Sequence, residues 1–388
     1  MNEKAIEHHK EWKGKIEINS RAPVTNKEEL AIAYTPGVAS PCIAIKDDPS
    51  LSYELTRRGN LVAVISDGTA VLGLGDIGPL AAMPVMEGKC SLFKEFADVD
   101  AFPICLDTKD VDEIVRTIEL LSPSFGGINL EDIAAPRCFE IERRLKESLD
   151  IPIFHDDQHG TAIVTCAALI NAARASGKAL SDMKVVINGA GAAGIAIANL
   201  LLKLELDDII MVDIGGIVFD GDENLNSAQS DIAKLTNKHG RRGSLADALN
   251  GADAFIGVSR PNLVTADMVR SMNERPIIFA MANPTPEIMP DVANAAGAFI
   301  VGTGRSDFPN QINNVLAFPG IFKGALSVRT KEINDDMNLA AAHAIAGIIS
   351  DHELSREYIL PDAFDKRVVD MVSSAVADIA IKSGLARI

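Results

Sequence analysis

The sequence contains no run of 18 apolar residues, although hydrophobic residues make up 47% of its 388 positions. A transmembrane helix needs about 20 such residues, so we expect no membrane span. The first 15 residues are charged and contain no apolar core, which argues against an export signal. We therefore expect a globular, cytoplasmic protein, and its length allows two or three domains.

The sequence also contains few cysteines and fewer basic than acidic residues. The five cysteines are scattered and form no CxxC pair, which fits reduced thiols and argues against a disulfide framework or a zinc site. The net charge is -17, whereas nucleic-acid binding needs a basic face, so we expect no nucleic-acid partner. A small anionic substrate stays compatible with this charge, because local fields can oppose the net charge.

Two pairs of adjacent carboxylates each follow a short apolar run: Glu131 with Asp132, and Asp156 with Asp157. Neighbouring like charges repel, so a cation or a proton is expected to compensate them. Between the pairs, Pro136 opens a helical apolar pattern. The segment therefore predicts a strand, a helix and a second strand, and this crossover makes parallel neighbours about 4.8 Å apart.

Parallel neighbours end at the same edge of a sheet, where ligands usually bind. Four carboxylates at such an edge offer hard oxygen ligands, so the implied ion is Mg²⁺ or Mn²⁺. The alternative is two separate, solvated loop ends. His155 and His159 flank the second pair and are either further ligands or structural side chains.

Residues 61–78 predict a β-hairpin, because Asp67-Gly68 separates two apolar runs. Lys89 follows in an apolar, glycine-flanked setting. It either extends its ammonium to water or is a desolvated lysine whose lowered pKa makes it a base. Tyr34, just before the Pro36-Gly37 turn, is likewise either structural or an acid–base group.

A glycine-rich turn lies between a predicted strand at 184–188 and a helix, and it reads Gly189-Ala190-Gly191-Ala192-Ala193-Gly194. Asp213 ends the next strand, 19 residues after Gly194. Strand, G-x-G-x-x-G, helix and acid together are a strong dinucleotide signature, in which the backbone approaches the pyrophosphate. Asp213 would accept from the ribose hydroxyls and repel a 2′-phosphate, which favours NAD over NADP.

Strands predicted at 254–258, 277–281 and 299–302 continue a doubly wound parallel sheet, followed by closing helices. Asn283 and Asn314 lie in loops after two of these strands. Their amides would suit a ligand carboxylate or carboxamide, or they simply form turns. We therefore expect an α/β fold with a catalytic, metal-binding domain at residues 1–157 and a Rossmann-type NAD(P)-binding domain at 158–388.

Six ordered blocks resemble malic enzymes of the short bacterial type, from about residue 10 to 380. The blocks are Tyr34-Thr-Pro-Gly-Val-Ala, Leu72-Gly-Leu-Gly-Asp-Ile-Gly, Met86-Glu-Gly-Lys89, Asn129-Leu-Glu131-Asp132, Phe154-His-Asp-Asp-Gln-His-Gly-Thr and Asn313-Asn314-Val-Leu-Ala-Phe-Pro-Gly. The resemblance implies a homodimer that oxidatively decarboxylates L-malate to pyruvate and CO₂ while reducing NAD(P), with oxaloacetate as a further substrate for decarboxylation.

The resemblance also implies roles for individual residues. The implied metal ligands are Glu131, Asp132 and Asp157. Lys89 is implied as the general base for the C2 hydroxyl, with Asp156 tuning it, and Tyr34 as the acid that protonates C3. The implied substrate-binding residues are Lys89, Asn283 and Asn314, with Asn283 also near the nicotinamide.

One family position differs, and two other functions stay open. Malic enzymes of the longer branch carry an arginine just before the Leu-Gly-Leu-Gly-Asp block, whereas Ala70 and Val71 stand there in this chain. The group that binds the substrate carboxylate is therefore not identified by the resemblance. The alternative functions are malolactic conversion of malate to lactate with bound NAD, and a catalytically inactive dinucleotide-sensing regulatory protein.

Overall fold

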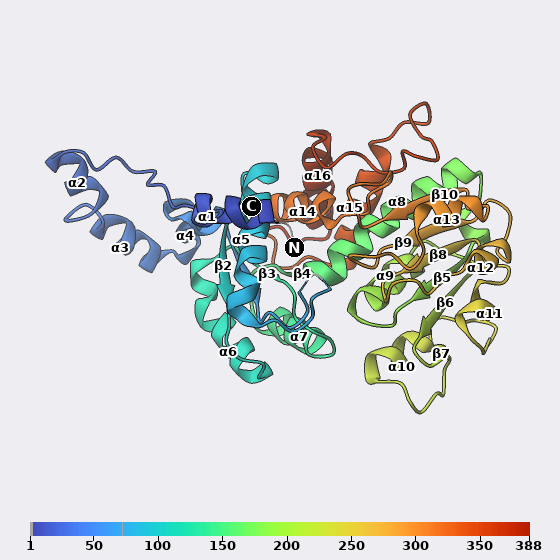
Figure 1. Ribbon diagram of the computed structural model, residues 1–388. Helices are drawn as coiled ribbons and strands as arrows, with labels where there is room; N and C mark the ends of the chain where they lie inside the picture. Colours follow the sequence, from blue (N-terminus) through green and yellow to red (C-terminus); the bar gives the residue numbers. More distant parts are fainter. Residues whose placement is uncertain (1–2, 72) are drawn as a thin grey trace.

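A computed structural model describes residues 3–71 and 73–388 of the chain (Figure 1). Leu72, which begins the Leu-Gly-Leu-Gly-Asp block, lies outside the described residues. The described chain contains two sheets, one of four strands and one of six. The expected fold class is confirmed. Within the described ranges, no helix is both long enough and apolar enough to span a membrane.

The four-stranded sheet is parallel and has the strand order β2-β1-β3-β4. Its strands are β1 Leu61–Ser66, β2 Asp100–Cys105, β3 Gly127–Leu130 and β4 Ile153–His155. The helices of this part are α1 Glu3–Trp12, α2 Lys27–Ala33, α3 Ala39–Asp47, η1 Pro49–Leu51, α4 Ser52–Leu55, η2 Arg57–Asn60, α5 Gly78–Ala97, α6 Val111–Leu121, η3 Ser122–Ser124 and α7 Arg137–Ser148. Strands β1, β3 and β4 are almost entirely buried, as is typical of parallel sheets that are covered on both faces.

The predicted crossover between the two acidic pairs is confirmed. Helix α7 connects β3 to β4, and the two strands pair in parallel with Leu130 opposite His155. The chain leaves β3 at Glu131 and leaves β4 at Asp156. Both acidic pairs therefore start from the same edge of the sheet.

The predicted hairpin over residues 61–78 is wrong. β1 pairs in parallel with β2 and β3, and the chain after Asp67 forms a loop with a bridge between Val71 and Gly75. A fully buried strand satisfies its backbone through two neighbours, so the Asp67-Gly68 turn leads out of the sheet and not back along it. The loop ends directly at α5, a helix that the sequence pattern did not predict.

The six-stranded sheet has the order β10-β9-β8-β5-β6-β7, and only the β6–β7 pair is antiparallel among its described pairings. Its strands are β5 Lys184–Asn188, β6 Asp208–Asp213, β7 Gly216–Ile217, β8 Ala254–Gly257, β9 Ile277–Ala280 and β10 Ile300–Thr303. The helices around it are α8 Thr161–Ser176, η5 Leu180–Asp182, α9 Ala192–Leu202, α10 Ser227–Ala233, α11 Leu245–Leu249, α12 Ala266–Arg270 and α13 Pro290–Ala295. The predicted doubly wound sheet is confirmed.

The C-terminal helices pack on one another, and the first of them returns to α5 beside the four-stranded sheet (Figure 1). They are α14 Phe318–Ser327, α15 Asp335–Gly347 and α16 Arg367–Lys382, preceded by η6 Asn314–Leu316. Phe93 on α5 packs edge-on against Phe318 and Phe322 on α14, with ring centroids 4.8 and 5.3 Å apart. The domain boundary between residues 157 and 158 stays a prediction, because one apolar core runs across it.

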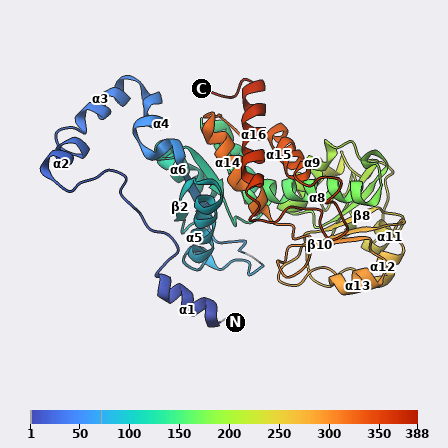
Figure 2. The ribbon, with the colours of Figure 1, turned by 90° about the horizontal axis from the view of Figure 1, so that it is seen from above.

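Helices α2 and α3 form an arm that extends away from the rest of the molecule (Figures 1 and 2). In the described chain, no residue of either helix is buried. The arm instead exposes apolar side chains, including Ile32, Tyr34 and Ile43. A cluster of exposed apolar side chains is typical of a surface that contacts another protein.

Candidate active site

Three carboxylates meet at the carboxyl edge of the four-stranded sheet. Glu131 and Asp132 follow β3, and Asp157 lies in the π-helical turn η4 Asp156–Gly160 that follows β4. One oxygen atom from each of the three lies within 4.8 Å of the others. The backbone N–H of Asp132 donates to Asp157 Oδ2 at 2.8 Å, so the two loops are joined directly. Since Glu131 and Asp132 are buried, the alternative of separate solvated loop ends is wrong.

The electrostatics of this cluster fit a divalent cation. Burial raises the pKa of Glu131 to about 7, of Asp132 to about 9 and of Asp157 to about 6, and repulsion from neighbouring carboxylates contributes to each increase. Asp132 Oδ2 is buried without a hydrogen-bond partner among the described residues. A cation would satisfy this oxygen and keep the carboxylates charged. The donors are all oxygens, as Mg²⁺ and Mn²⁺ prefer.

Lys89 lies on α5 with its ammonium against the same cluster. Its Nζ is 2.9 Å from Glu131 Oε1 and 2.5 Å from Asp156 Oδ2, and it sits 4.2 Å from the centre of the Phe318 ring. The side chain is buried, so the alternative of a lysine that reaches into water is wrong. Burial alone lowers the pKa of Lys89, but the two carboxylates outweigh burial and raise it. The expected lowered pKa is therefore wrong for the metal-free protein.

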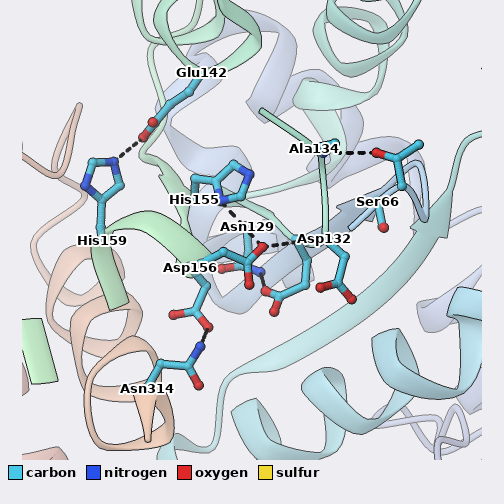
Figure 3. A network of polar contacts seen from close by, with 12 residues as sticks. Ser66, Asn129, Asp132, Ala134, Glu142, His155, Asp156, His159 and Asn314 are labelled. Atoms are coloured by element: carbon cyan, nitrogen blue, oxygen red, sulfur yellow. Dashed lines mark hydrogen bonds and ion pairs between the residues drawn. The ribbon is translucent and has the colours of Figure 1, made fainter. Parts of the chain in front are cut away.

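Asp156 is placed apart from the three clustered carboxylates. It contacts Lys89, and Asn314 at the start of η6 donates from Nδ2 to Asp156 Oδ2 (Figure 3). Burial raises the pKa of Asp156 to about 7 despite Lys89. A Cβ on Gly160 would lie 2.0 Å from Asp156 Oδ1, so only glycine leaves room for this carboxylate. The structure thus brings together Lys89 and Asp156, which the resemblance pairs, and places Asn314 beside them; their roles stay predictions.

The two histidines beside the cluster have structural surroundings. His159 Nε2 is 2.6 Å from Glu142 Oε1, a contact across the α7 crossover (Figure 3). Glu142 is buried, but His159 and Lys146 lower its pKa. His155 is fully buried, and neither ring nitrogen has a hydrogen-bond partner among the described residues, although Nδ1 lies 3.8 Å from Asp157 Oδ2. Burial lowers the pKa of His155 to about 4. Sequence reasoning missed Glu142, whose signal was a charge beside Ile141 on the apolar side of α7.

A large cavity of about 1110 Å³ opens onto the carboxylates. From the sheet side it is lined by Lys89, Glu131, Asp132, Asp157 and Asn314. The N-terminal segment contributes a further part of the lining, which includes His9, Trp12, Lys15 and Glu17. Tyr34 is not among the described residues that line it, since Tyr34 lies on the arm and is 66% exposed. Sequence reasoning missed the N-terminal wall, for which no local pattern exists.

A second cavity, of about 780 Å³, lies at the edge of the six-stranded sheet. Its walls include Gly189, Gly191 and Asp213. Behind Gly191 the first turn of α9 contains Ala192, Ala193 and Gly194, where a Cβ on Gly194 would lie 1.8 Å from the Gly189 oxygen. The predicted glycine turn and acid therefore meet around one space. That space is of the size that ligand sites usually have.

Gln229 links the two predicted parts of this second site. Its Nε2 donates to Asp213 Oδ2 at 2.7 Å and to the oxygen of Ala190 at 3.2 Å. Gln229 also closes a capping box with Asn226 at the start of α10. Sequence reasoning missed this residue, although the Asn226-x-x-Gln229 spacing is a capping signal.

Asn283 follows β9 and lies between the two halves. A Cβ on Gly73 would lie 2.6 Å from the oxygen of Asn283, and one on Gly304 would lie 3.0 Å from its Nδ2. Gly73 also has a φ of +74°, which favours glycine. Among the described residues, Asn283 lines neither of the two cavities. Its roles in substrate and cofactor binding stay predictions.

Two family models match nearly the whole chain. The one described as malic enzyme, N-terminal domain, matches residues 13–146, and the one described as malic enzyme, NAD binding domain, matches residues 158–382. This chain belongs to the malic enzyme family. The resemblance stated from the six sequence blocks is therefore confirmed, and the family places an NAD(P)-binding domain at the glycine turn.

Curated relatives and solved structures agree with this assignment. The bifunctional malic/malolactic enzyme of Bacillus subtilis is 58% identical over all of this chain and 95% of its own length. The NAD-dependent malic enzyme of Geobacillus stearothermophilus is 56% identical over 96% of this chain and 78% of its own length. The crystal structure of the NAD-dependent malic enzyme of Thermotoga maritima superimposes with a TM-score of 0.93 at 50% identity, covering 96% of this chain and 98% of that one.

Proposed function

We propose that the chain oxidatively decarboxylates L-malate to pyruvate and CO₂, with Mg²⁺ or Mn²⁺ as the metal and NAD as the favoured acceptor. The observation that carries the proposal is the position of Lys89. Its ammonium contacts Glu131, a member of the carboxylate cluster, and Asp156, which stands apart from it. This places the lysine at the cavity wall, where its neutral form could take a proton from a hydroxyl that enters the cavity.

The residues at the edge of the first sheet would have separate roles. Glu131, Asp132 and Asp157 would hold the cation. When bound, the cation would act as a Lewis acid on a substrate oxygen and offset part of the negative charge that raises the pKa of Lys89. Lys89, as the neutral amine, would remove the proton from the C2 hydroxyl and become an ammonium, while Asp156 and Asn314 keep its side chain in position.

The residues of the second sheet would bind the dinucleotide. The glycine turn would accept the pyrophosphate at the N-terminus of α9, and Asp213, held by Gln229, would accept from the ribose hydroxyls. When bound, the nicotinamide would accept the hydride from C2. The family contains NAD- and NADP-dependent relatives. The carboxylate of Asp213 supports NAD for this chain, because it would repel a 2′-phosphate.

We further propose that the protein is a homodimer in which the arm of one copy supplies Tyr34 to the site of the other. Supporting this, Tyr34 directly follows α2 and is exposed, and helices α2 and α3 extend away from α5 and the four-stranded sheet of their own chain (Figure 2). Tyr34 would there protonate C3 after CO₂ leaves. The exposed apolar face of the arm would be covered in the same contact.

Mixing two inactive variants tests whether the arm supplies Tyr34 to the site of the second copy. When Tyr34→Phe and Lys89→Ala proteins are unfolded together and refolded, half of the dimers are mixed, and each has one site with both residues intact. Activity should then recover to about a quarter of the wild-type value, as expected for a two-fold symmetric dimer. A mixture that stays as inactive as either parent would contradict the supply of Tyr34 from a second copy.

The reaction itself is tested with purified protein, L-malate, Mn²⁺ or Mg²⁺, and each of NAD and NADP. Nicotinamide reduction should accompany pyruvate formation, and the absence of pyruvate from every combination would contradict the proposal. Lactate without net reduction would instead indicate malolactic conversion, an alternative favoured by the name of the Bacillus subtilis relative. Dinucleotide binding without turnover would indicate a sensing protein. We expect the enzyme to act in the cytoplasm.

A further inference from the structure

The carboxylate cavity contains too little positive charge for a substrate with two carboxylates. Glu131, Asp132 and Asp157 line the cavity together with the exposed Glu17, and Asp156 contacts Lys89 without lining it. Lys89 and a divalent cation would carry three positive charges against the four carboxylates at this edge, which leaves no positive charge for the substrate. Ala70 and Val71 stand just before the Leu-Gly-Leu-Gly-Asp block, where malic enzymes of the longer branch carry an arginine. The site that would perform the proposed reaction therefore needs a further cation for the substrate.

The residues that line this cavity include three basic side chains, His9, Lys15 and Lys89. Lys89 is committed to two carboxylates, and the Nδ1 of His9 is bonded to the oxygen of Ala5 at 2.7 Å. Lys15 differs from both. Its Nζ donates to the oxygen of Pro84 at 2.6 Å, and within the described ranges no carboxylate oxygen lies within 4 Å of it. An ammonium carries three N–H groups, so two of them are left for a ligand.

Lys15 is held against the helix that carries Lys89. Its backbone N–H donates to Glu87 Oε2 at 3.0 Å, and its Nζ would lie 3.5 Å from a Cβ on Gly88, the residue before Lys89. The side chain is partly buried, and burial lowers the pKa of Lys15 although Glu87 opposes this. A partly desolvated ammonium on the cavity wall gains more from a carboxylate than one in bulk water does.

We infer that Lys15 binds one carboxylate of the substrate and so fills the place of the missing arginine. The inference rests on the proposed function, since it assigns part of the specificity for a 2-hydroxy dicarboxylate over a monocarboxylate. Arg137 is the rival. Its side chain reaches the residues just before Ala70, but its Nη2 already donates there to Asp67 at 2.8 Å and to Thr69 at 3.1 Å. Arg137 is also not among the described residues that line the cavity.

Steady-state kinetics of Lys15→Met, Lys15→Gln and Lys15→Arg test the inference. The KM for L-malate should rise about tenfold to a hundredfold in the Met and Gln variants, as for the loss of a hydrogen bond to a charged group. The Arg variant should retain most of the affinity. The kcat, the KM for NAD and the Kd for Mn²⁺ should change much less, which separates substrate binding from damage to the fold. Lys13→Met is the matched control, because Lys13 is exposed in the same segment.

The outcomes separate the inference from the function on which it rests. Wild-type protein that forms no pyruvate from malate contradicts the proposed function. Active wild-type protein with unchanged KM for malate in the Lys15→Met and Lys15→Gln variants overturns the role of Lys15 alone. A rise in KM for malate in Arg137→Met, without one in the Lys15 variants, also overturns it, in favour of Arg137.

Discussion

The two sheets of this enzyme end in edges of opposite character. At the four-stranded sheet, Glu131, Asp132 and Asp156 are buried, and Glu131 and Asp156 both contact Lys89. At the six-stranded sheet, the cavity is lined by the glycines of the turn and by Asp213, which is only partly buried. The first edge offers charged side chains to a metal and a proton, whereas the second offers backbone N–H groups to a phosphate.

The two edges should differ in how much they cost the stability of the fold. Buried carboxylates are unfavourable unless a cation, a lysine or a proton compensates them, so the first edge is stable only with its partners in place. Glycines and a partly solvated acid carry no such cost. Substitutions of the charged residues at the first edge should therefore change catalysis and metal binding, whereas substitution of Asp213 at the second edge should change the choice of dinucleotide.

Removal of Lys89 should have the largest effect. We expect Lys89→Ala to lower kcat by about 10²- to 10⁴-fold, as for the loss of a general base. The Kd for NAD should stay within about twofold, because Lys89 lies at the other edge, and isothermal titration measures it. A variant with more than a tenth of wild-type kcat would show that Lys89 is not the base.

Replacement of Asp213 should change selectivity without changing chemistry. In Asp213→Ser, the ratio of kcat/KM with NAD to that with NADP should fall about tenfold to a hundredfold, since repulsion of the 2′-phosphate is removed. The kcat with saturating NAD and the Kd for Mn²⁺ should be unchanged. An unaltered ratio in paired NAD and NADP kinetics would contradict the role of Asp213.

The pair of Glu142 and His159 should make the first half sensitive to acid. Because the folded protein lowers the pKa of Glu142, the stabilisation is fully present above the unfolded pKa, near 4.5, and declines as the pH falls below it. Glu142→Gln should lower the free energy of unfolding by about 2 kcal/mol at pH 7 and by less at pH 3.

Urea unfolding of metal-free protein at the two pH values measures this difference. Glu147→Gln on the exposed side of the same helix is the control, and its ion pair with Arg143 should contribute no more than about 0.5 kcal/mol. An equal loss from Glu142→Gln at both pH values would show that its charge does not stabilise the fold.

Local sequence patterns predicted those parts of the site that lie within one strand–helix–strand unit. The β3–α7–β4 unit and the Gly189–Gly194 turn with Asp213 each fit within a few dozen residues, so apolar runs and turn residues were sufficient. Helix α5 was missed because Pro84 and Gly88 are poor helix formers, and packing against the sheet stabilises it instead. The contacts of Lys15 with α5 and of His159 with Glu142 depend on tertiary packing, which no spacing in the sequence encodes.

The central claim is that the neighbours Asp156 and Asp157 have separate duties, with Asp157 facing the metal and Asp156 facing Lys89. Mn²⁺ titration of Asp157→Asn and Asp156→Asn, followed by electron paramagnetic resonance of the free ion, tests it most directly. We expect the Kd for Mn²⁺ to rise at least about a hundredfold in Asp157→Asn and less than about tenfold in Asp156→Asn. Equal weakening in both variants, or greater weakening in Asp156→Asn, would contradict the claim.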